Sequence, residues 1–501
     1  MSSATAPDGA LDRALLAVAG VVVLGAVMSI LDATVVNVAI NTLARDFDTS
    51  LSTIQWIVTG YTLALATVIP LTGWGADRFG TKRLYILSIV LFLAGSALSG
   101  AAWSAESLIL FRVLQGLGGG MLMPAGMTIL TRAAGPQRVG RVMAIMGVPM
   151  LLGPILGPIL GGWLVDDVSW RWIFFINLPI GVIALFLATR VLPKDRPQPS
   201  ERLDVLGLVL LSPGLALMIY GLAQSTGHGF GSANVLVPVL AGVALLALFV
   251  RHALRASNPL IDLRLFLNRT FTTASITLVL MVISVFGAML LLPLYVQAVR
   301  GESALQSGLL LAPQGIGAML MMPLAGRLTD RTGIGMVVLP GLALVALSTL
   351  WLTQLAGDTS YWVLSADLFV MGMGMGLSMM PLFSGAMQTL RKAAVARAST
   401  TLNILQQVAA SIGTAVMSVL LTTALQDRLP GAPDGGGLGQ TGRDLPAQIR
   451  DLMAEAFGHT YIWATVLVLV AFAAAWMLPR RRPEPIEEEE DDAALVAVHA
   501  Y

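Results

Sequence analysis

The sequence contains no cysteine among its 501 residues. That absence excludes disulfides, thiolate metal sites and a cysteine nucleophile. Charge is also scarce: only 12% of the residues are Asp, Glu, Lys or Arg, whereas soluble domains carry about 25%. Hydrophobic residues make up 56% of the chain, and the mean hydropathy is +0.79. The composition therefore excludes a soluble globular domain and is typical of a membrane protein.

Histidine and nucleotide-binding patterns are scarce as well. The four histidines fall on expected loops, span ends and the tail, and so predict no metal site; they are His228, His252, His459 and His499. The phosphate-binding pattern GxxxxGK[ST] does not occur, so ATP is not the expected energy source. We therefore expect no metal, no cofactor and no enzymatic activity.

Long apolar runs recur from Leu15 to Leu478. A helix needs about 20 apolar residues to cross the hydrocarbon core of a bilayer. On that measure the sequence predicts roughly fourteen transmembrane helices, an all-α polytopic membrane protein. The expected spans lie near 14–42, 52–73, 83–103, 107–131, 142–165, 173–192, 205–223, 234–252, 271–297, 307–326, 335–355, 362–386, 399–425 and 460–478.

The positions of the basic residues orient these spans. If the N-terminus is cytoplasmic, the segments on the cytoplasmic side carry most of the 30 Lys and Arg residues. The outer segments then carry Arg45, Arg171, Arg300, Arg428, Arg443 and Arg450. Because Lys and Arg concentrate in cytoplasmic loops, we predict a multi-pass protein of the cell membrane with both termini cytoplasmic.

The spans group into two sets of six with two spans between them. We expect an N-terminal six-helix bundle over residues 1–192 and a C-terminal one over 270–478, with a linker and two extra helices over 193–269. A long outer loop is expected at 426–459, which contains GAPDGGGLGQTG. The end of this loop, PAQIRDLMAEAFGH, has helical periodicity and is expected to lie at the membrane surface. The tail over 479–501 is expected to be cytoplasmic, and its run EEEEDD is most simply a solvated segment.

One acid and one base are expected deep in the membrane. Arg112 stands in LILFRVLQG and Asp32 in SILDATVV, each within a predicted span. A charge at the bilayer centre costs about 2.5–3.5 kcal/mol, so such residues usually face a partner or a cavity. From the helical rise, Asp32 is expected roughly 15 Å and Arg112 roughly 9 Å below the outer surface, close enough for coupling. The two predict a proton-coupled transporter; the alternative is a static ion pair that orients two helices.

A short pattern occurs at corresponding places in the two halves. GWGADRFG (73–80) lies between spans two and three, and GRLTDRTG (326–333) lies between spans ten and eleven. Both fit G-x-x-x-D-R-x-G, a repeat typical of two-bundle transporters. We expect a tight hairpin, with each Asp near the start of the following helix, where the helix dipole favours it. A turn that merely sets topology is the alternative, although it does not explain the repeated spacing. The residues of this loop motif are Gly73, Asp77, Arg78, Gly80, Asp330 and Arg331.

Five segments, in this order, resemble those of a known family. They are LDATVVNVA (31–39), the first loop motif (73–80), LILFRVLQG (108–116), GPILGPILGG (153–162) and SWRWIFFINLPIG (169–181). The chain resembles the major facilitator superfamily over nearly its whole length, and in particular the fourteen-span drug:proton antiporter branch of the EmrB/QacA type. The resemblance implies the major facilitator fold with two extra helices, gating by the loop motif, and a part for Arg112 in proton transfer.

Glycine and proline dominate the expected fifth span. Gly153, Gly157 and Gly161 are four residues apart, so they share a helix face on which a neighbouring helix can approach closely. Prolines remove backbone hydrogen bonds and favour a bend. The resemblance implies that this helix seals the cavity against proton leak and moves during exchange; the alternative is a packing seam without a transport role. The expected antiporter motif comprises Gly153, Pro154, Gly157, Pro158, Gly161 and Gly162.

Polar residues within other spans are candidates for a substrate cavity. Interhelical hydrogen bonding is the alternative for each of them. The Met-rich run MGMGMGLSMM (371–380) offers a soft surface suited to varied apolar ligands, or ordinary packing. The polar candidates are Asn37, Tyr61, Gln115, Gln314, Asn403 and Gln407.

Together these patterns predict a proton-coupled exporter of lipophilic, often cationic small molecules that works by alternating access, as a monomer in the lipid bilayer and without nucleic acid. The alternative within this class is a dedicated exporter of one metabolite, such as a lipid, a siderophore or a self-made antibiotic. A lipid-modifying enzyme would need His, Asp or Ser clustered on one interfacial loop, and the sequence offers no such cluster. A transporter-like sensor would bind substrate without flux.

Overall fold

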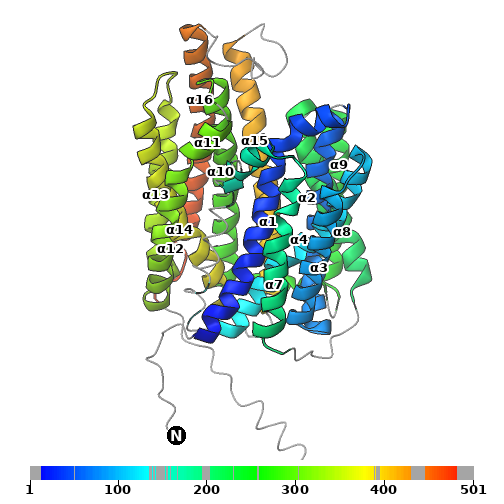
Figure 1. Ribbon diagram of the computed structural model, residues 1–501. Helices are drawn as coiled ribbons and strands as arrows, with labels where there is room; N and C mark the ends of the chain where they lie inside the picture. Colours follow the sequence, from blue (N-terminus) through cyan, green and yellow to red (C-terminus); the bar gives the residue numbers. More distant parts are fainter. Residues whose placement is uncertain are drawn as a thin grey trace, which may run out of the picture.

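The structure is a computed structural model. It describes residues 13–49, 51–134, 138, 142, 153, 156–157, 159–165, 167–194, 203–228, 231–256, 259–302, 304–388, 390, 395–429 and 446–481. Asn37 and Asp330 lie in described helices, but their side chains fall outside the described part. The described chain is built of helices that run along one long axis (Figure 1).

In the part of the chain that the structure describes, six helices precede the two extra ones. They are α1 (Arg13–Asp46), α2 (Leu51–Phe79), α3 (Thr81–Gly100), α4 (Ala105–Ala134), the short α6 (Trp172–Phe175) and α7 (Asn177–Val191). The two extra helices are α8 (Val205–His228) and α9 (Ala233–Ala253). Among these, α2 packs most extensively on α4, and α3 also packs on α4.

The remaining helices form a second group. They are the 3₁₀ turn η1 (Leu263–Leu267), α10 (Arg269–Ala298), α11 (Ala304–Leu310), α12 (Ala312–Arg331), α13 (Ile334–Trp351), η2 (Leu352–Gln354), α14 (Tyr361–Gln388), α15 (Val395–Arg428) and α16 (Ala447–Ala475). Here α12 and α13 pack on α14, and α10 packs on α15 and α16. The proposed domain boundaries, at 192/193 and 269/270, stay a prediction.

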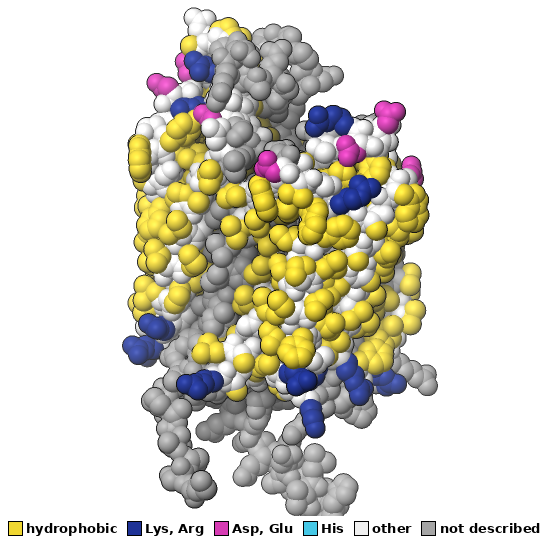
Figure 2. Space-filling view, viewed as in Figure 1, with side chains coloured by type: hydrophobic (Ala, Val, Ile, Leu, Met, Phe, Trp, Pro, Cys, Tyr) yellow, Lys and Arg dark blue, Asp and Glu magenta, His cyan; other side chains and the backbone are white. Residues whose placement is uncertain are grey.

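Thirteen helices of the described chain are long and apolar enough to cross a membrane. Each coincides with an expected span, and the remaining expected span, near 142–165, falls largely on residues outside the described part. The space-filling view shows why this composition needs a bilayer (Figure 2). A broad apolar band crosses the visible face, most visible Lys and Arg gather at the end where α1 begins, and Asp and Glu gather at the other end. A helix satisfies its own backbone hydrogen bonds, so it can present such a surface to lipid.

The two extra helices are attached at one side of the contact between the two groups. α8 packs against both α2 and α15, and α9 packs on α8. An apolar cluster joins Leu211 and Leu215 of α8 to Ile69 of α2 and Ile404 of α15. Ser212 Oγ donates to the backbone oxygen of Thr67 in α2 at 2.7 Å. α8 therefore bridges the first and second groups of helices.

Three expectations about the loops need correction. The expected outer loop at 426–459 is shorter, because α15 continues to Arg428 and α16 begins at Ala447. The helical periodicity of PAQIRDLMAEAFGH extends the last transmembrane helix instead of forming a separate surface segment. The acidic residues of the loop motif were also misplaced: Asp77 and Asp330 lie in the last turns of α2 and α12, not at the start of the following helices.

The glycines that close the two loop motifs both adopt a positive φ. Gly80 has φ 96° and Gly333 has φ 150°, both in the region that side chains with a Cβ rarely occupy. Each glycine stands directly before a helix, α3 in one case and α13 in the other. The repeated sequence pattern thus places a positive-φ glycine directly before the following helix in both groups of helices.

Candidate functional site

A buried ion pair joins α1 to α4. Arg112 Nη1 lies 2.6 Å from Asp32 Oδ2, and each residue is 1% exposed. Burying two charges is costly unless they are paired and hydrogen-bonded, so a pair at this depth needs further polar partners. The structure therefore brings together the acid and the base that the sequence places in the membrane.

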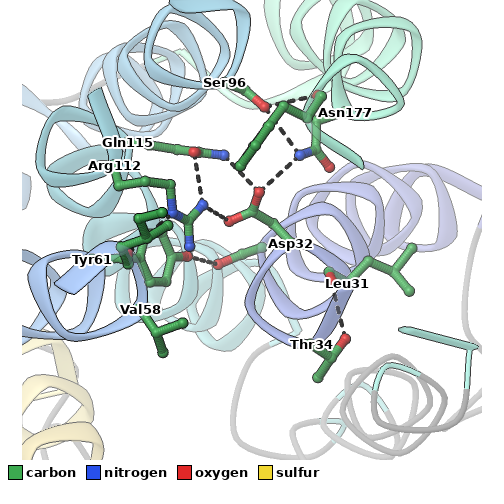
Figure 3. Close-up of polar contacts among 12 residues, drawn as sticks. Leu31, Asp32, Thr34, Val58, Tyr61, Ser96, Arg112, Gln115 and Asn177 are labelled. Carbon is green, nitrogen blue, oxygen red and sulfur yellow. Dashed lines mark hydrogen bonds and ion pairs between the residues drawn. The ribbon is translucent and has the colours of Figure 1, made fainter. Parts of the chain in front are cut away.

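Amide side chains complete the bonding of the carboxylate (Figure 3). Gln115 Nε2 donates to Asp32 Oδ1 at 2.8 Å, and Gln115 Oε1 accepts from Arg112 Nη1 at 2.8 Å. Asn177 Nδ2 donates to Asp32 Oδ1 at 3.0 Å and lies 3.1 Å from Ser96 Oγ. The carboxylate is thus contacted from α4 and α7, and the network reaches α3 through Ser96.

Aromatic rings cover the guanidinium group. Its central carbon lies 4.1 Å from the ring centroid of Tyr61 in α2 and 5.7 Å from that of Phe174 in α6. Arg112 Nε also lies 3.5 Å from the backbone oxygen of Ile57. Such cation–π contacts stabilise a desolvated guanidinium. The hydroxyl of Tyr61 lies 3.5 Å from Ser29 Oγ, one turn before Asp32 in α1.

Glycines of α4 make this compact arrangement possible. A Cβ on Gly116 would lie 2.5 Å from the backbone oxygen of Tyr61, and one on Gly120 would lie 2.6 Å from that of Leu65. Real Cβ atoms do not approach backbone so closely. The sequence LQGLGGG therefore sets α4 directly on α2, with Arg112 and Gln115 facing the centre of the first group of helices.

A cavity of about 330 Å³ lies beside this network. Its walls come from α1, α2 and α4 in the first group and from α10, α12, α14 and α15 in the second. Tyr61 and Ser29 line it, so a single layer of side chains separates the Asp32–Arg112 pair from the cavity. Its volume lies at the lower end of the range of small-molecule sites.

Four of the six expected cavity residues line this cavity: Tyr61, Gln314, Asn403 and Gln407. Gln115 does not line it, because its amide is bonded to both members of the ion pair instead. The side chain of Asn37 falls outside the described residues. The Met-rich run contributes Met375 and Met379 to the lining.

The expected antiporter segment lies against α1. Gly153 faces Ile30, Gly157 faces Thr34 and Gly161 faces Val35, each so closely that an added methyl group would be crowded. Thr34 Oγ1 also donates to the backbone oxygen of Gly153 at 3.1 Å. The expected close approach at these glycines is therefore confirmed. Gly162 has open space at its Cβ position and does not belong to this contact, and Pro154 and Pro158 lie outside the described residues.

The first loop motif contains an ion pair at the end of the helices. Asp77 Oδ1 lies 3.1 Å from Arg132 Nη2 of α4, with the arginine side chain 40% exposed. Gly73 is buried, and Arg78 and Arg331 are exposed at the ends of α2 and α12. The acid thus ties α2 to α4 at the same end of the molecule as the turn of Gly80.

The sequence interpretation missed Asn177 and Ser96 as members of the polar network. Asn177 stands in SWRWIFFINLPIG, which was recognised only as a family-like segment. A single asparagine in an apolar span was a usable signal, since amides within membranes hydrogen-bond between helices. Ser96 gave no signal, because serine hydroxyls commonly bond the backbone of their own helix.

Comparison with known proteins agrees with this architecture. The model of the family described as Major Facilitator Superfamily matches residues 22–414. The "Multidrug resistance protein B homolog" of Mycobacterium tuberculosis is 47% identical over 494 residues, covering 94% of this chain and 91% of that protein. The "Multidrug export protein EmrB" of Escherichia coli is 32% identical over 398 residues, covering 79% of this chain and 78% of that protein.

Solved structures support the fold alone. The human organic anion transporter MFSD10 superimposes with a TM-score of 0.61 at 17% identity, covering 92% of this chain and 99% of that one. The proton:xylose symporter XylE superimposes with a TM-score of 0.55 at 14% identity, covering 91% of this chain and 95% of that one.

Proposed function

The chain belongs to the Major Facilitator Superfamily, and we propose that it is a proton-driven exporter of lipophilic small molecules, a drug:proton antiporter working by alternating access. The relatives named as multidrug resistance and export proteins support drugs as the cargo. The observation that carries proton coupling is the buried Asp32–Arg112 pair, one side-chain layer from a cavity between the two groups of helices. Ionisable groups inside a membrane commonly mark such proton paths.

The proposed cycle uses Asp32 as the proton carrier. When Asp32 accepts a proton, its attraction to Arg112 falls, and the guanidinium keeps Gln115 and the face of Tyr61 as partners. Because Tyr61 and Ser29 line the cavity, a shift of this network changes the cavity wall. Loss of the proton to the other side of the membrane restores the pair. Proton and substrate thus act on one wall without occupying the same atoms.

The fifth span and the loop motif have supporting parts in the proposal. Gly153 and Gly157 contact α1 at Ile30 and Thr34, on either side of Asp32 in the sequence. Motion of that span is therefore transmitted to the helix that carries the acid. The Asp77–Arg132 pair closes α2 on α4 at the end where basic residues gather (Figure 2), and we propose that this end, with both termini, faces the cytoplasm.

The decisive test is Asp32→Asn. The amide keeps the shape of the carboxylate and one of its two accepting oxygens, but it cannot carry a proton. We expect the variant to insert and bind drug, while drug-dependent proton flux in reconstituted vesicles falls to the level of empty vesicles. Asp46→Asn is the matched control, because Asp46 stands on the same helix but bonds Trp170 Nε1 at its end, at 2.8 Å.

Unchanged drug-driven proton flux in Asp32→Asn would remove this residue from the mechanism. A broad panel of lipophilic drugs and metabolites tests the range of substrates. If only one metabolite drives proton flux, the protein is a dedicated exporter and not a multidrug exporter.

A further inference from the structure

We infer that the cavity is built for neutral lipophilic molecules that carry hydrogen-bonding groups, and that it disfavours organic cations. The inference rests on the proposed export function and names its substrate class. It narrows the sequence expectation, which included cationic molecules.

The described lining of the cavity contains no Asp, Glu, Lys or Arg. Its polar members are hydroxyl and amide side chains, of which Gln314, Asn403, Gln406 and Gln407 are the amides. The fifth span is largely outside the described residues, but its sequence over 143–165 has no charged residue either. A bound cation would therefore meet dipoles and apolar groups, with no opposite charge in contact.

The nearest acid cannot serve as that opposite charge. Asp32 is itself paired with Arg112 and bonded by two amides, and the ring of Tyr61 covers the guanidinium on the cavity side. Asp367 in α14 accepts from Ser348 Oγ at 2.7 Å and does not line the cavity. A cation leaving water for this cavity would lose hydration without gaining a counter-charge, which is unfavourable. A neutral molecule loses far less.

The remaining lining has features that suit such a molecule. Carboxamides donate and accept, so the three on α15 can meet a carbonyl, hydroxyl or amide group. Gln314 Nε2 lies 3.2 Å from Met375 Sδ, a weak acceptor that a ligand oxygen can replace favourably. Met123, Met289 and Met379 supply adaptable apolar surface. The cavity thus combines hydrogen-bonding amides with the adaptable apolar surface of the methionines.

A matched pair of small molecules tests the inference. Triphenylphosphine oxide and methyltriphenylphosphonium share three phenyl rings on phosphorus and differ in carrying a neutral acceptor oxygen or a permanent positive charge. Equilibrium dialysis of the full-length protein in detergent, with binding to protein-free micelles subtracted, should show at least tenfold tighter binding of the neutral oxide. Gln407→Glu, measured at pH 8, should reduce or reverse this preference by placing a carboxylate in the lining. Gln354→Glu adds the same charge at the exposed turn η2 and should leave the preference unchanged.

Equal or tighter binding of methyltriphenylphosphonium by the unmodified protein would overturn the inference. So would an unchanged preference in Gln407→Glu, or binding of neither molecule. Drug-driven proton flux with cationic drugs would then still leave the export function standing. Absence of flux with every drug would instead overturn the export function itself, so the two failures are distinct.

Discussion

Asp32 and Arg112 cancel each other in charge but are unequal in their other partners. The carboxylate accepts hydrogen bonds from the amides of Gln115 and Asn177. The guanidinium donates to the amide oxygen of Gln115 and, at 3.5 Å, to the backbone oxygen of Ile57. It also contacts the ring faces of Tyr61 and Phe174. Removing the base would leave a buried carboxylate held only by neutral donors. Removing the acid would leave a cation still held by the ring of Tyr61. The two single substitutions should therefore differ in their effect on stability.

We predict that Arg112→Gln destabilises the protein by about 3–5 kcal/mol, since breaking a buried pair leaves an uncompensated charge. Asp32→Asn combined with Arg112→Gln should recover most of this loss, because no charge is then buried. The double variant should still lack drug-dependent proton flux. Thermal unfolding in detergent, followed by tryptophan fluorescence, measures the first effect, and reconstituted vesicles measure the second. Normal flux in the double variant would make the pair a static link between α1 and α4.

At this scale the sequence predicted the pair but not its surroundings. Two charges in apolar spans are unusual enough to imply each other. The remaining partners depend on how α3, α4 and α7 rotate, and rotation is set by close packing, such as that of Gly116 on Tyr61. Because the sequence does not show how α4 rotates, it also led us to expect Gln115 in the cavity. Its position one turn from Arg112 is equally compatible with a cavity residue and with a member of the ion-pair network.

Among the helices, α1 connects the proton-carrying group to the fifth span. Asp32 points towards Arg112, while Thr34, two residues later, lies on another face of α1 (Figure 3). Thr34 Oγ1 bonds the backbone oxygen of Gly153, and Gly157 packs on the same side chain. A rotation of α1 therefore moves both contacts together.

We predict that Gly157→Ala lowers drug export at least tenfold, because the new methyl group collides with Thr34 and separates the fifth span from α1. Gly162→Ala is the control, since its Cβ position faces open space within the described residues. Both variants add the same atom to the same helix. Export of a fluorescent drug from whole cells, normalised to the amount of protein in the membrane, distinguishes them. Equal export by the two variants would mean that the seam has no role in transport.

The extra helix α8 makes different contacts with its two neighbours. It is attached to α2 by the hydrogen bond of Ser212 and by stacking of Tyr220 on Trp56, with ring centroids 5.6 Å apart. Its contacts with α15 are aliphatic, as at Met218 and Ala415. Directional contacts fix a position, whereas aliphatic surfaces slide at lower cost. We therefore expect α8 to move with α2 and to slide along α15.

Cross-linking tests this division, and the absence of native cysteine simplifies it. Cysteines at Ser212 and Thr67, joined by a short bifunctional maleimide, should leave export within twofold of the uncross-linked protein. Cysteines at Met218 and Ala415, joined in the same way, should abolish export. The measurement is drug uptake by inverted vesicles before and after cross-linking. Full export after the second cross-link would show that α8 and α15 do not move past each other.

The number and order of helices could be predicted, but the placement of α8 and α9 could not. Runs such as Val205–Leu222 identify a span from length and apolarity alone. Which neighbours it meets depends on matching apolar surfaces, and Leu211, Ile69 and Ile404 are ordinary lipid-compatible residues in the sequence. The length of the outer loop was overestimated because a helix that rises beyond the membrane carries charges that resemble those of a loop.

For the whole molecule, the net charge moved across the membrane in each transport cycle depends on the charge of the substrate that enters the cavity. If the cargo is neutral and the proton moves inward, each cycle transfers net positive charge inward. One elementary charge moved through 100 mV is worth about 2.3 kcal/mol, roughly a 50-fold change in the gradient that can be sustained. Exchange of one monovalent cation for one proton would transfer no net charge and would not respond to voltage.

We therefore predict that a membrane potential alone drives accumulation of a neutral drug. The measurement uses inverted vesicles in which valinomycin and a potassium gradient impose an inside-positive potential without a pH difference. This potential drives protons out of the lumen, and in an antiporter their exit is coupled to drug entry. Uptake of triphenylphosphine oxide should rise several-fold when the potential is imposed, and Asp32→Asn should abolish the rise. An imposed pH gradient, acid inside, should drive the same uptake at zero potential. Uptake that responds to pH but not to voltage would indicate electroneutral exchange. A second charge would then have to cross the membrane with the proton, and it would have to be bound by residues outside the described lining of the cavity.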